Sequence, residues 1–162
     1  MSIIALGQTV SSRRQELGLT QERLAKMTNV SRRTIQALES GMLKDIGYDR
    51  LSRLLDVLGL SLTPDLAPRK KRKGLWMAAK NASVSYRGEL SPEMLERTLA
   101  TAEAPTGFGA HVGHFLDESP LDYVVMAVEE AAKQEHRKPA EIWANVRQLA
   151  LRHSIKRKDV WA

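Results

Sequence analysis

Side chains that could hold a metal or transfer a proton are few, and they lie in the second half of the sequence. His111, His114 and Asp117 are spaced three residues apart, so they could share one helix face, as metal ligands sometimes do. Ordinary histidines on a short helix are the simpler interpretation. Glu129 and Glu130 are adjacent and point in different directions, so a solvated helix face explains them better than an acid–base pair does.

The motifs of common enzyme classes are missing as well. The sequence contains no cysteine, which excludes a disulfide framework, a thiolate zinc site and a cysteine nucleophile. It also contains no glycine-rich phosphate loop, nucleophile elbow or zinc-protease motif. We therefore expect a protein that is not an enzyme and that uses no metal and no cofactor.

The positive charge is unevenly distributed. The formal net charge is +6, and it divides into +3 for residues 1–60, +4 for residues 61–74 and −1 for residues 75–162. An excess of lysine and arginine in one half of a chain favours a polyanion as partner, and phosphate-bearing nucleic acid is the commonest one.

The first segment has the pattern of short helices that begin at capping residues. Thr20 and Ser31 are capping residues, Gly18 and Gly41 end helices, and Asn29 tolerates the left-handed backbone of a tight turn. Two short helices joined by a turn of three or four residues are typical of a helix-turn-helix unit. Leucines at 51, 54, 55 and 58 predict a further helix.

Four elements in this segment resemble the XRE family of phage-repressor and Cro-type regulators. They are RQELGLTQ at 14–21, LA at 24–25, VSRRTI at 30–35 and LESG at 38–41. The resemblance covers residues 5–62 and implies a lambda-repressor-like helix-turn-helix bundle that binds DNA. Asn29 stands where the family usually has glycine, and Thr28 where a small apolar residue is usual.

A recognition helix presents its N-terminal residues to base edges in the major groove, and here these are residues 31–34. Arg32 and Arg33 are the best candidates, because a guanidinium can donate two hydrogen bonds to guanine. The full set of expected DNA-binding residues is Gln21, Ser31, Arg32, Arg33, Thr34, Gln36, Ala37, Ser40 and Lys44. The resemblance implies that Arg14 and Glu39 pair with each other and are structural. The residues alone leave two interpretations of Arg13 and Arg23, as solvated surface charges or as DNA contacts.

Prolines and a basic run separate the two halves. Pro64 and Pro68 interrupt helical continuation, and residues 69–73 are all lysine or arginine. We predict a helix-turn-helix domain at 1–63, a linker at 64–74 and a second domain at 75–162. The run could be an arm that contacts the DNA backbone or a solvated linker, whereas a nuclear localisation signal does not fit a prokaryotic-looking regulator.

The second segment predicts a small all-helical domain for interaction or oligomerisation. Ser91-Pro92, Ser119-Pro120 and Pro139 look like helix starts, and a short helix is expected near residues 111–116. Aromatic residues are expected in the core more often than in an interface: Trp76, Tyr86, Phe108, Phe115, Tyr123 and Trp143. Trp161, near a basic tail, could dock on a partner chain or belong to a frayed terminus.

These observations predict an all-α, dimeric DNA-binding regulator that represses its own operon from an inverted-repeat operator of double-stranded DNA. The arrangement of the domains is similar to antitoxins of toxin–antitoxin operons, which implies the alternative that the second domain neutralises a cognate toxin. Either domain could form the homodimer. No signal peptide and no run of ~20 apolar residues is found, so we expect a soluble, cytoplasmic protein without a membrane partner.

Overall fold

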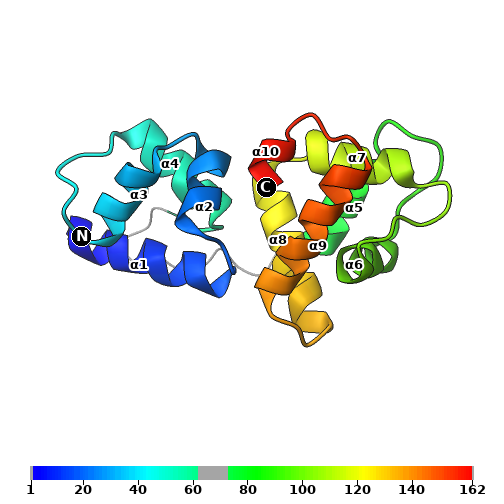
Figure 1. Cartoon of the computed structure of the whole chain (residues 1–162), viewed down its shortest axis with the longest axis horizontal. Helices are drawn as coiled ribbons and strands as arrows, with labels where there is room; N and C mark the ends of the chain where they lie inside the picture. The colour runs from blue at the N-terminus through cyan, green and yellow to red at the C-terminus, as the bar shows by residue number, and fades with distance from the viewer. Residues whose placement is uncertain (1, 62–72, 162) are drawn as a thin grey trace. The chain divides into compact units, whose positions relative to one another are not determined.

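The computed structural model describes residues 2–61 and 73–161. Within these ranges the chain is helical and contains no strand, which confirms the predicted all-α fold (Figure 1). The chain divides into two compact units, Met1–Lys70 and Lys71–Ala162. None of the described helices is long and apolar enough to cross a membrane.

The described part of the first unit contains four helices. They are α1 (Ile3–Glu16), α2 (Gln21–Thr28), α3 (Arg32–Glu39) and α4 (Tyr48–Val57). The predicted caps are confirmed, because the hydroxyl of Thr20 accepts from the Arg23 backbone N–H and that of Ser31 from the Thr34 N–H, each at 3.1 Å. A side-chain acceptor at this position satisfies a helix N–H group that has no partner within the helix.

Helices α1 and α3 approach each other closely at Gly7. A Cβ atom on Gly7 would lie 1.9 Å from the backbone oxygen of Leu38, so only glycine fits there. Val10 of α1 and Ile35 and Leu38 of α3 are fully buried at 0% exposure. The backbone of α3 is therefore seated directly against α1.

The carboxylate of Glu39 joins the first three helices. Arg14 of α1 donates to it twice, through Nε to Oε1 at 2.6 Å and through Nη2 to Oε2 at 2.8 Å. Gln21 of α2 and Ser11 of α1 also donate to Oε2, at 2.9 and 3.2 Å. This confirms the expected structural pair. Ser11 is not predicted from the sequence, although its spacing of three residues from Arg14 places both on one face of α1.

Burial alone would raise the pKa of Glu39, whose side chain is only 7% exposed. The hydrogen bonds from Arg14, Gln21 and Ser11, together with the positive charge of Arg14, outweigh burial and hold the pKa below its ordinary value. Glu39 therefore stays ionised within the fold.

The described part of the second unit contains six helices. They are α5 (Gly74–Ser83), α6 (Pro92–Thr101), α7 (Gly109–Asp117), α8 (Leu121–Gln134), α9 (Pro139–Arg152) and α10 (Lys158–Trp161). Helix α8 packs against α5, α6 and α9, and its valines and alanines form much of the core (Figure 1). The predicted starts at Ser91-Pro92 and Pro139 are confirmed, because both prolines occupy the first turn of a helix.

The helix start predicted at Ser119-Pro120 is confirmed, because α8 begins at Leu121, but the Ser119 hydroxyl does not cap this helix as the Ser91 hydroxyl caps α6. Pro120 is the capping residue of α8 and no side chain caps that helix. The Ser119 hydroxyl instead donates to the Asn81 side-chain oxygen at 2.6 Å, and Ser119 is fully buried. The hydroxyl therefore links the start of α8 to α5.

Both expectations for Trp161 are wrong. The residue is 1% exposed and stacks on Trp143 of α9, with 6.2 Å between ring centroids. Its indole N–H donates to the Leu116 backbone oxygen at 3.2 Å, and the Arg157 guanidinium lies 5.5 Å from its ring centroid. Apolar burial and these polar contacts hold Trp161 within its own unit.

The other aromatic residues divide between core and surface. Phe115 and Trp143 are buried as expected, but Trp76 is 50% exposed and Tyr86 is 39% exposed. The predicted linker at 64–74 lies outside the described residues except for Lys73, which is exposed, and Gly74, which begins α5.

The substitution Gly7→Ala should destabilise the first unit, because the added methyl group collides with the backbone of α3. Overpacking against backbone costs roughly 1–3 kcal/mol or more. In thermal unfolding followed by circular dichroism, we therefore expect the transition of the first unit to disappear or to move down by about 10 °C. All three tryptophans lie in the second unit, so the transition followed by tryptophan fluorescence should not move.

Gly113→Ala is the matched control, since a Cβ there meets no atom within 4 Å. It should leave stability unchanged or raise it slightly. Equal effects of the two substitutions would contradict the close approach of α1 and α3.

The lowered pKa of Glu39 predicts a specific acid sensitivity. A carboxylate with a depressed pKa stabilises the folded state above its unfolded pKa of about 4.5, and this contribution disappears as the pH falls through the lower folded value. Glu39→Gln should cost about 3 kcal/mol at neutral pH, since it leaves the Arg14 charge without its partner, and should flatten the acid limb of a stability–pH profile. Glu16→Gln is the control, because the Glu16 carboxylate that pairs with Arg13 is itself exposed, and it should change neither the stability at neutral pH nor the acid limb. An equal loss of stability in Glu16→Gln would argue against a special role for Glu39.

Candidate nucleic-acid interface

The turn between α2 and α3 explains both departures from the family pattern. Asn29 adopts the left-handed conformation, with φ 52° and ψ 42°, which asparagine tolerates better than most residues with a side chain. Thr28 is buried, and its hydroxyl donates to the Leu24 backbone oxygen at 2.7 Å. The polar group at this buried position is therefore satisfied within α2, and the turn keeps its compact form.

The first turn of α3 exposes two guanidinium groups. Arg32 and Arg33 are exposed, and no carboxylate within the described ranges forms an ion pair with either of them. Cations at a helix N-terminus oppose the helix dipole, so the fold gains nothing locally from placing them there. Both side chains remain available for acceptors outside the protein.

The hydroxyl groups beside them serve a different role. Ser31 Oγ and Thr34 Oγ1 lie 2.8 Å apart, and Ser31 Oγ also accepts from the Thr34 backbone N–H. These contacts fix the start of α3. Ser31 is exposed and Thr34 is half-buried, so each hydroxyl is both a local structural group and close to the outer surface.

Helix α3 has two distinct faces. Ile35 and Leu38 are completely buried, whereas Gln36 is exposed one turn beyond Arg32 and Arg33, and Ala37 is half-buried. Because residues three and four apart share a helix face, Gln36 extends the surface that the two arginines begin. The result is a polar outer face on a helix whose inner face is fixed in the core.

Gln21, at the first position of α2, is tied into the interior. Its amide nitrogen donates to Glu39 Oε2 at 2.9 Å, and the residue is half-buried. The structure therefore connects Gln21 to the end of α3, and through Glu39 to Arg14, which holds the two helices of the motif together.

Ser40 and Lys44 follow α3 and are both exposed. The Ser40 hydroxyl donates to the Ala37 backbone oxygen at 3.2 Å.

Arg13 is not a solvated surface charge. Its side chain is 11% exposed, and its Nε donates to the Leu58 backbone oxygen at 3.1 Å. Arg13 therefore joins α1 to the end of α4.

Most of the basic run lies outside the described residues. Residues 69–72 belong to the part of the chain that the structure does not describe, and Lys73 alone is placed, as an exposed residue before α5. The choice between a DNA-contacting arm and a solvated linker therefore stays open.

The three metal candidates in the second unit have separate contacts. His111 is 3% exposed, its Nε2 lies 3.1 Å from the Gly88 backbone oxygen, and its ring packs against Phe108. His114 faces Glu118 at 3.3 Å. Asp117 Oδ1 accepts a hydrogen bond at 3.0 Å from the backbone N–H of Arg157, in the loop before α10. Within the described residues no group of three potential ligands is close enough to hold a metal.

Glu130 is not part of a purely solvated face. Its Oε2 accepts from the Leu75 backbone N–H at 2.9 Å, so it satisfies a free N–H group in the first turn of α5. This contact joins α8 to α5 and gives the residue a structural role that the sequence pattern does not predict.

Comparison with known proteins identifies the first unit. The family model described as helix-turn-helix matches residues 10–64, which include the second half of α1 and all of α2, α3 and α4. No curated protein and no solved structure matches the chain. Residues 10–64 therefore belong to the helix-turn-helix family of the XRE, lambda-repressor type, a family of DNA-binding transcription regulators and not of enzymes.

Proposed function

We propose that the protein is a sequence-specific repressor that binds an inverted-repeat operator as a homodimer and controls its own operon. The exposed pair Arg32 and Arg33, at the start of a helix fixed through Glu39, is the observation that carries this proposal. In a dimer, two such helices enter successive major grooves when the half-sites lie about one helical turn, ~34 Å, apart. A DNA-binding regulator of this kind acts in the cytoplasm.

Each residue of the interface takes a role that fits its chemistry. Arg32 and Arg33 donate pairs of hydrogen bonds to guanine O6 and N7, and Gln36 does the same with adenine N6 and N7. Ala37 contacts a thymine methyl group. Ser31 and Thr34 lie close to the bases and hold the start of α3.

The remaining contacts are with the DNA backbone. Lys44 is exposed on the loop after α3, and Ser40, also exposed, lies four residues before it at the end of α3. Gln21 meets a phosphate through its backbone N–H at the start of α2, where the helix N-terminus favours an anion, because its side-chain amide is engaged by Glu39. Such contacts position the protein and carry no sequence information by themselves.

The arginines can be tested on an operator selected from a random duplex library with the full-length protein. Arg32→Ala and Arg33→Ala should each weaken binding roughly 5- to 150-fold, which corresponds to about 1–3 kcal/mol, and should relax base preference at one position per half-site. Lys44→Ala should weaken all sequences equally and reduce the log–log salt slope by about 0.9.

Arg97→Ala is the matched control, because it removes an exposed arginine from α6 in the second unit. Affinity and base preference should stay as in the wild type. Unchanged specificity in both Arg32→Ala and Arg33→Ala would overturn the assignment of α3 as the reading helix.

The alternative is that the second unit binds a cognate toxin and the protein acts as an antitoxin. It is supported by the separate helical unit that follows the DNA-binding domain and by two large apolar side chains on its surface, Val84 at 77% and Leu151 at 66% exposure. Val84 lies at the end of α5 and Leu151 lies on α9, and both are outside the region that matches the family.

Pull-down of the tagged full-length chain from nuclease-treated native lysate separates the two functions. The repressor proposal predicts recovery of the chain alone and a dimer mass in sedimentation equilibrium. One stoichiometric partner that is lost with Val84→Ser and Leu151→Ser, but kept with Arg32→Ala, would favour the antitoxin.

A further inference from the structure

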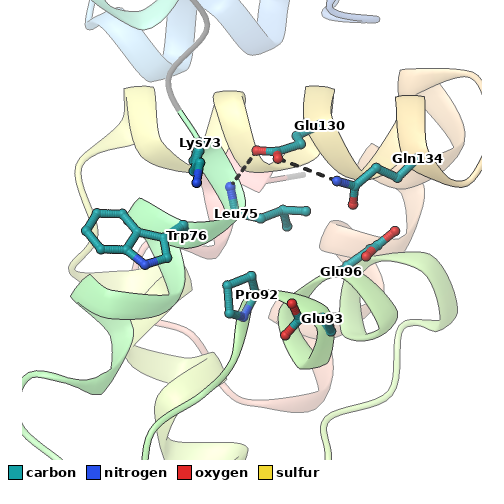
Figure 2. Close-up of a pocket in the computed structure, with 8 residues that line it drawn as sticks. All are labelled: Lys73, Leu75, Trp76, Pro92, Glu93, Glu96, Glu130 and Gln134. Atoms are coloured by element: carbon teal, nitrogen blue, oxygen red, sulfur yellow. Dashed lines mark hydrogen bonds between the residues drawn. The ribbon is translucent and has the colours of Figure 1, made fainter.

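The second unit contains a pocket of about 500 Å³ between the start of α5, the first turns of α6 and one face of α8 (Figure 2). Trp76, Leu75 and Pro92 form its apolar part, and Glu93, Glu96 and Glu130 supply carboxylates. The volume lies within the range of sites that hold small molecules. All of these residues belong to the second unit, outside the helix-turn-helix family region.

The apolar part of the pocket includes an accessible indole. Trp76 is 50% exposed on the first turn of α5, and Figure 2 shows its ring at one end of the pocket, with Pro92 between it and Glu93. The face of an indole attracts a cation more strongly than any other side-chain ring does. A half-exposed tryptophan also provides surface for an alkyl chain.

Two of the carboxylates are held in place by the fold. Glu130 keeps one oxygen on the Leu75 backbone N–H at 2.9 Å, and Figure 2 shows its carboxylate facing the pocket. A hydrogen bond from Ser91, followed by one from its own backbone, lowers the pKa of Glu93, so this group stays ionised at the start of α6. The carboxylates of Glu93 and Glu130 therefore lie at the pocket already, and neither side chain has to move far to meet a ligand.

Glu96 has an amide neighbour but no paired cation in the described part of the chain: the Gln134 side-chain nitrogen donates to both Glu96 oxygens at 2.9 Å. Burial raises its pKa, and the negative charges of Glu135, Glu130 and Glu93 raise it further. Within the described residues no lysine or arginine forms an ion pair with it, and Lys73 is the one cation that lines the pocket. Three carboxylates against one ammonium group leave the pocket negative.

We propose that this pocket binds an organic cation, namely an alkyl chain that carries a primary ammonium or guanidinium group. The charged group lies at Glu96, between Glu93 and Glu130, and the alkyl chain packs on Trp76 and Pro92. Such a cation relieves the repulsion among the carboxylates and uses the indole face. The inference goes beyond DNA binding, because it assigns a ligand to the second unit.

The same chemistry can come from a free polyamine-like molecule or from a lysine side chain of another protein. Agmatine represents the first source, and the blocked peptide acetyl-Gly-Lys-Gly-amide represents the second. Calorimetric titration of the full-length protein without DNA should give saturable binding of agmatine at one site per chain. Tighter binding of the peptide would assign the pocket to a partner's side chain, with the cation chemistry unchanged.

Variants locate the site. Glu96→Gln should weaken agmatine binding about tenfold, since it removes a charge-assisted hydrogen bond, and Trp76→Leu should weaken it several-fold. Because Glu96→Gln also removes like-charge repulsion, its thermal stability should equal or exceed that of the wild type, which shows that weakened binding does not come from unfolding.

Glu103→Gln is the matched control, because it makes the same charge change at an exposed carboxylate outside the pocket and should leave agmatine affinity unchanged. The inference is overturned if no saturable binding occurs below about 10 mM, or if Glu103→Gln weakens binding as much as Glu96→Gln does. Since DNA is absent from the titration, failure here is distinguishable from failure of operator binding.

Discussion

The arrangement of the DNA-binding unit depends on one buried carboxylate. Glu39 ends α3 and accepts hydrogen bonds from Arg14 of α1 and Gln21 of α2, so the three helices share a single fixed point. Paired donors from a planar guanidinium impose direction as well as attraction. Burial of such a pair brings little net stability, because both ions lose water. Its value to the fold is the fixed orientation of α3, on which the placement of Arg32 and Arg33 depends.

Features set by neighbouring residues were predictable from the sequence. The caps at Thr20, Ser31 and Ser91 and the left-handed Asn29 need only groups within about four residues, so sequence spacing is sufficient to identify them. The same locality explains why the start of α3 could be identified as an outward-facing basic segment. The DNA contacts themselves depend on a partner molecule and stay predictions.

Contacts between distant segments were not predictable. Arg13 donates to the Leu58 backbone oxygen across 45 residues of sequence, and Ser119 donates to Asn81 across 38 residues. Glu130 accepts from the Leu75 backbone N–H across 55 residues. Trp161 is buried by Trp143 and Leu116 for the same reason. Charge counting also missed the acidic pocket: a net charge of −1 over residues 75–162 conceals a local excess of carboxylates that only the packing of α5, α6 and α8 brings together.

The two faces of α3 have unequal freedom to diverge. Ile35 and Leu38 are locked in the core and Glu39 is engaged by three partners, so substitutions there threaten folding. Arg32, Arg33 and Gln36 are exposed, and surface changes away from such contacts alter stability little. After a gene duplication, one copy could therefore come to recognise a new operator through a few substitutions on the outer face of α3, while its buried residues stay the same.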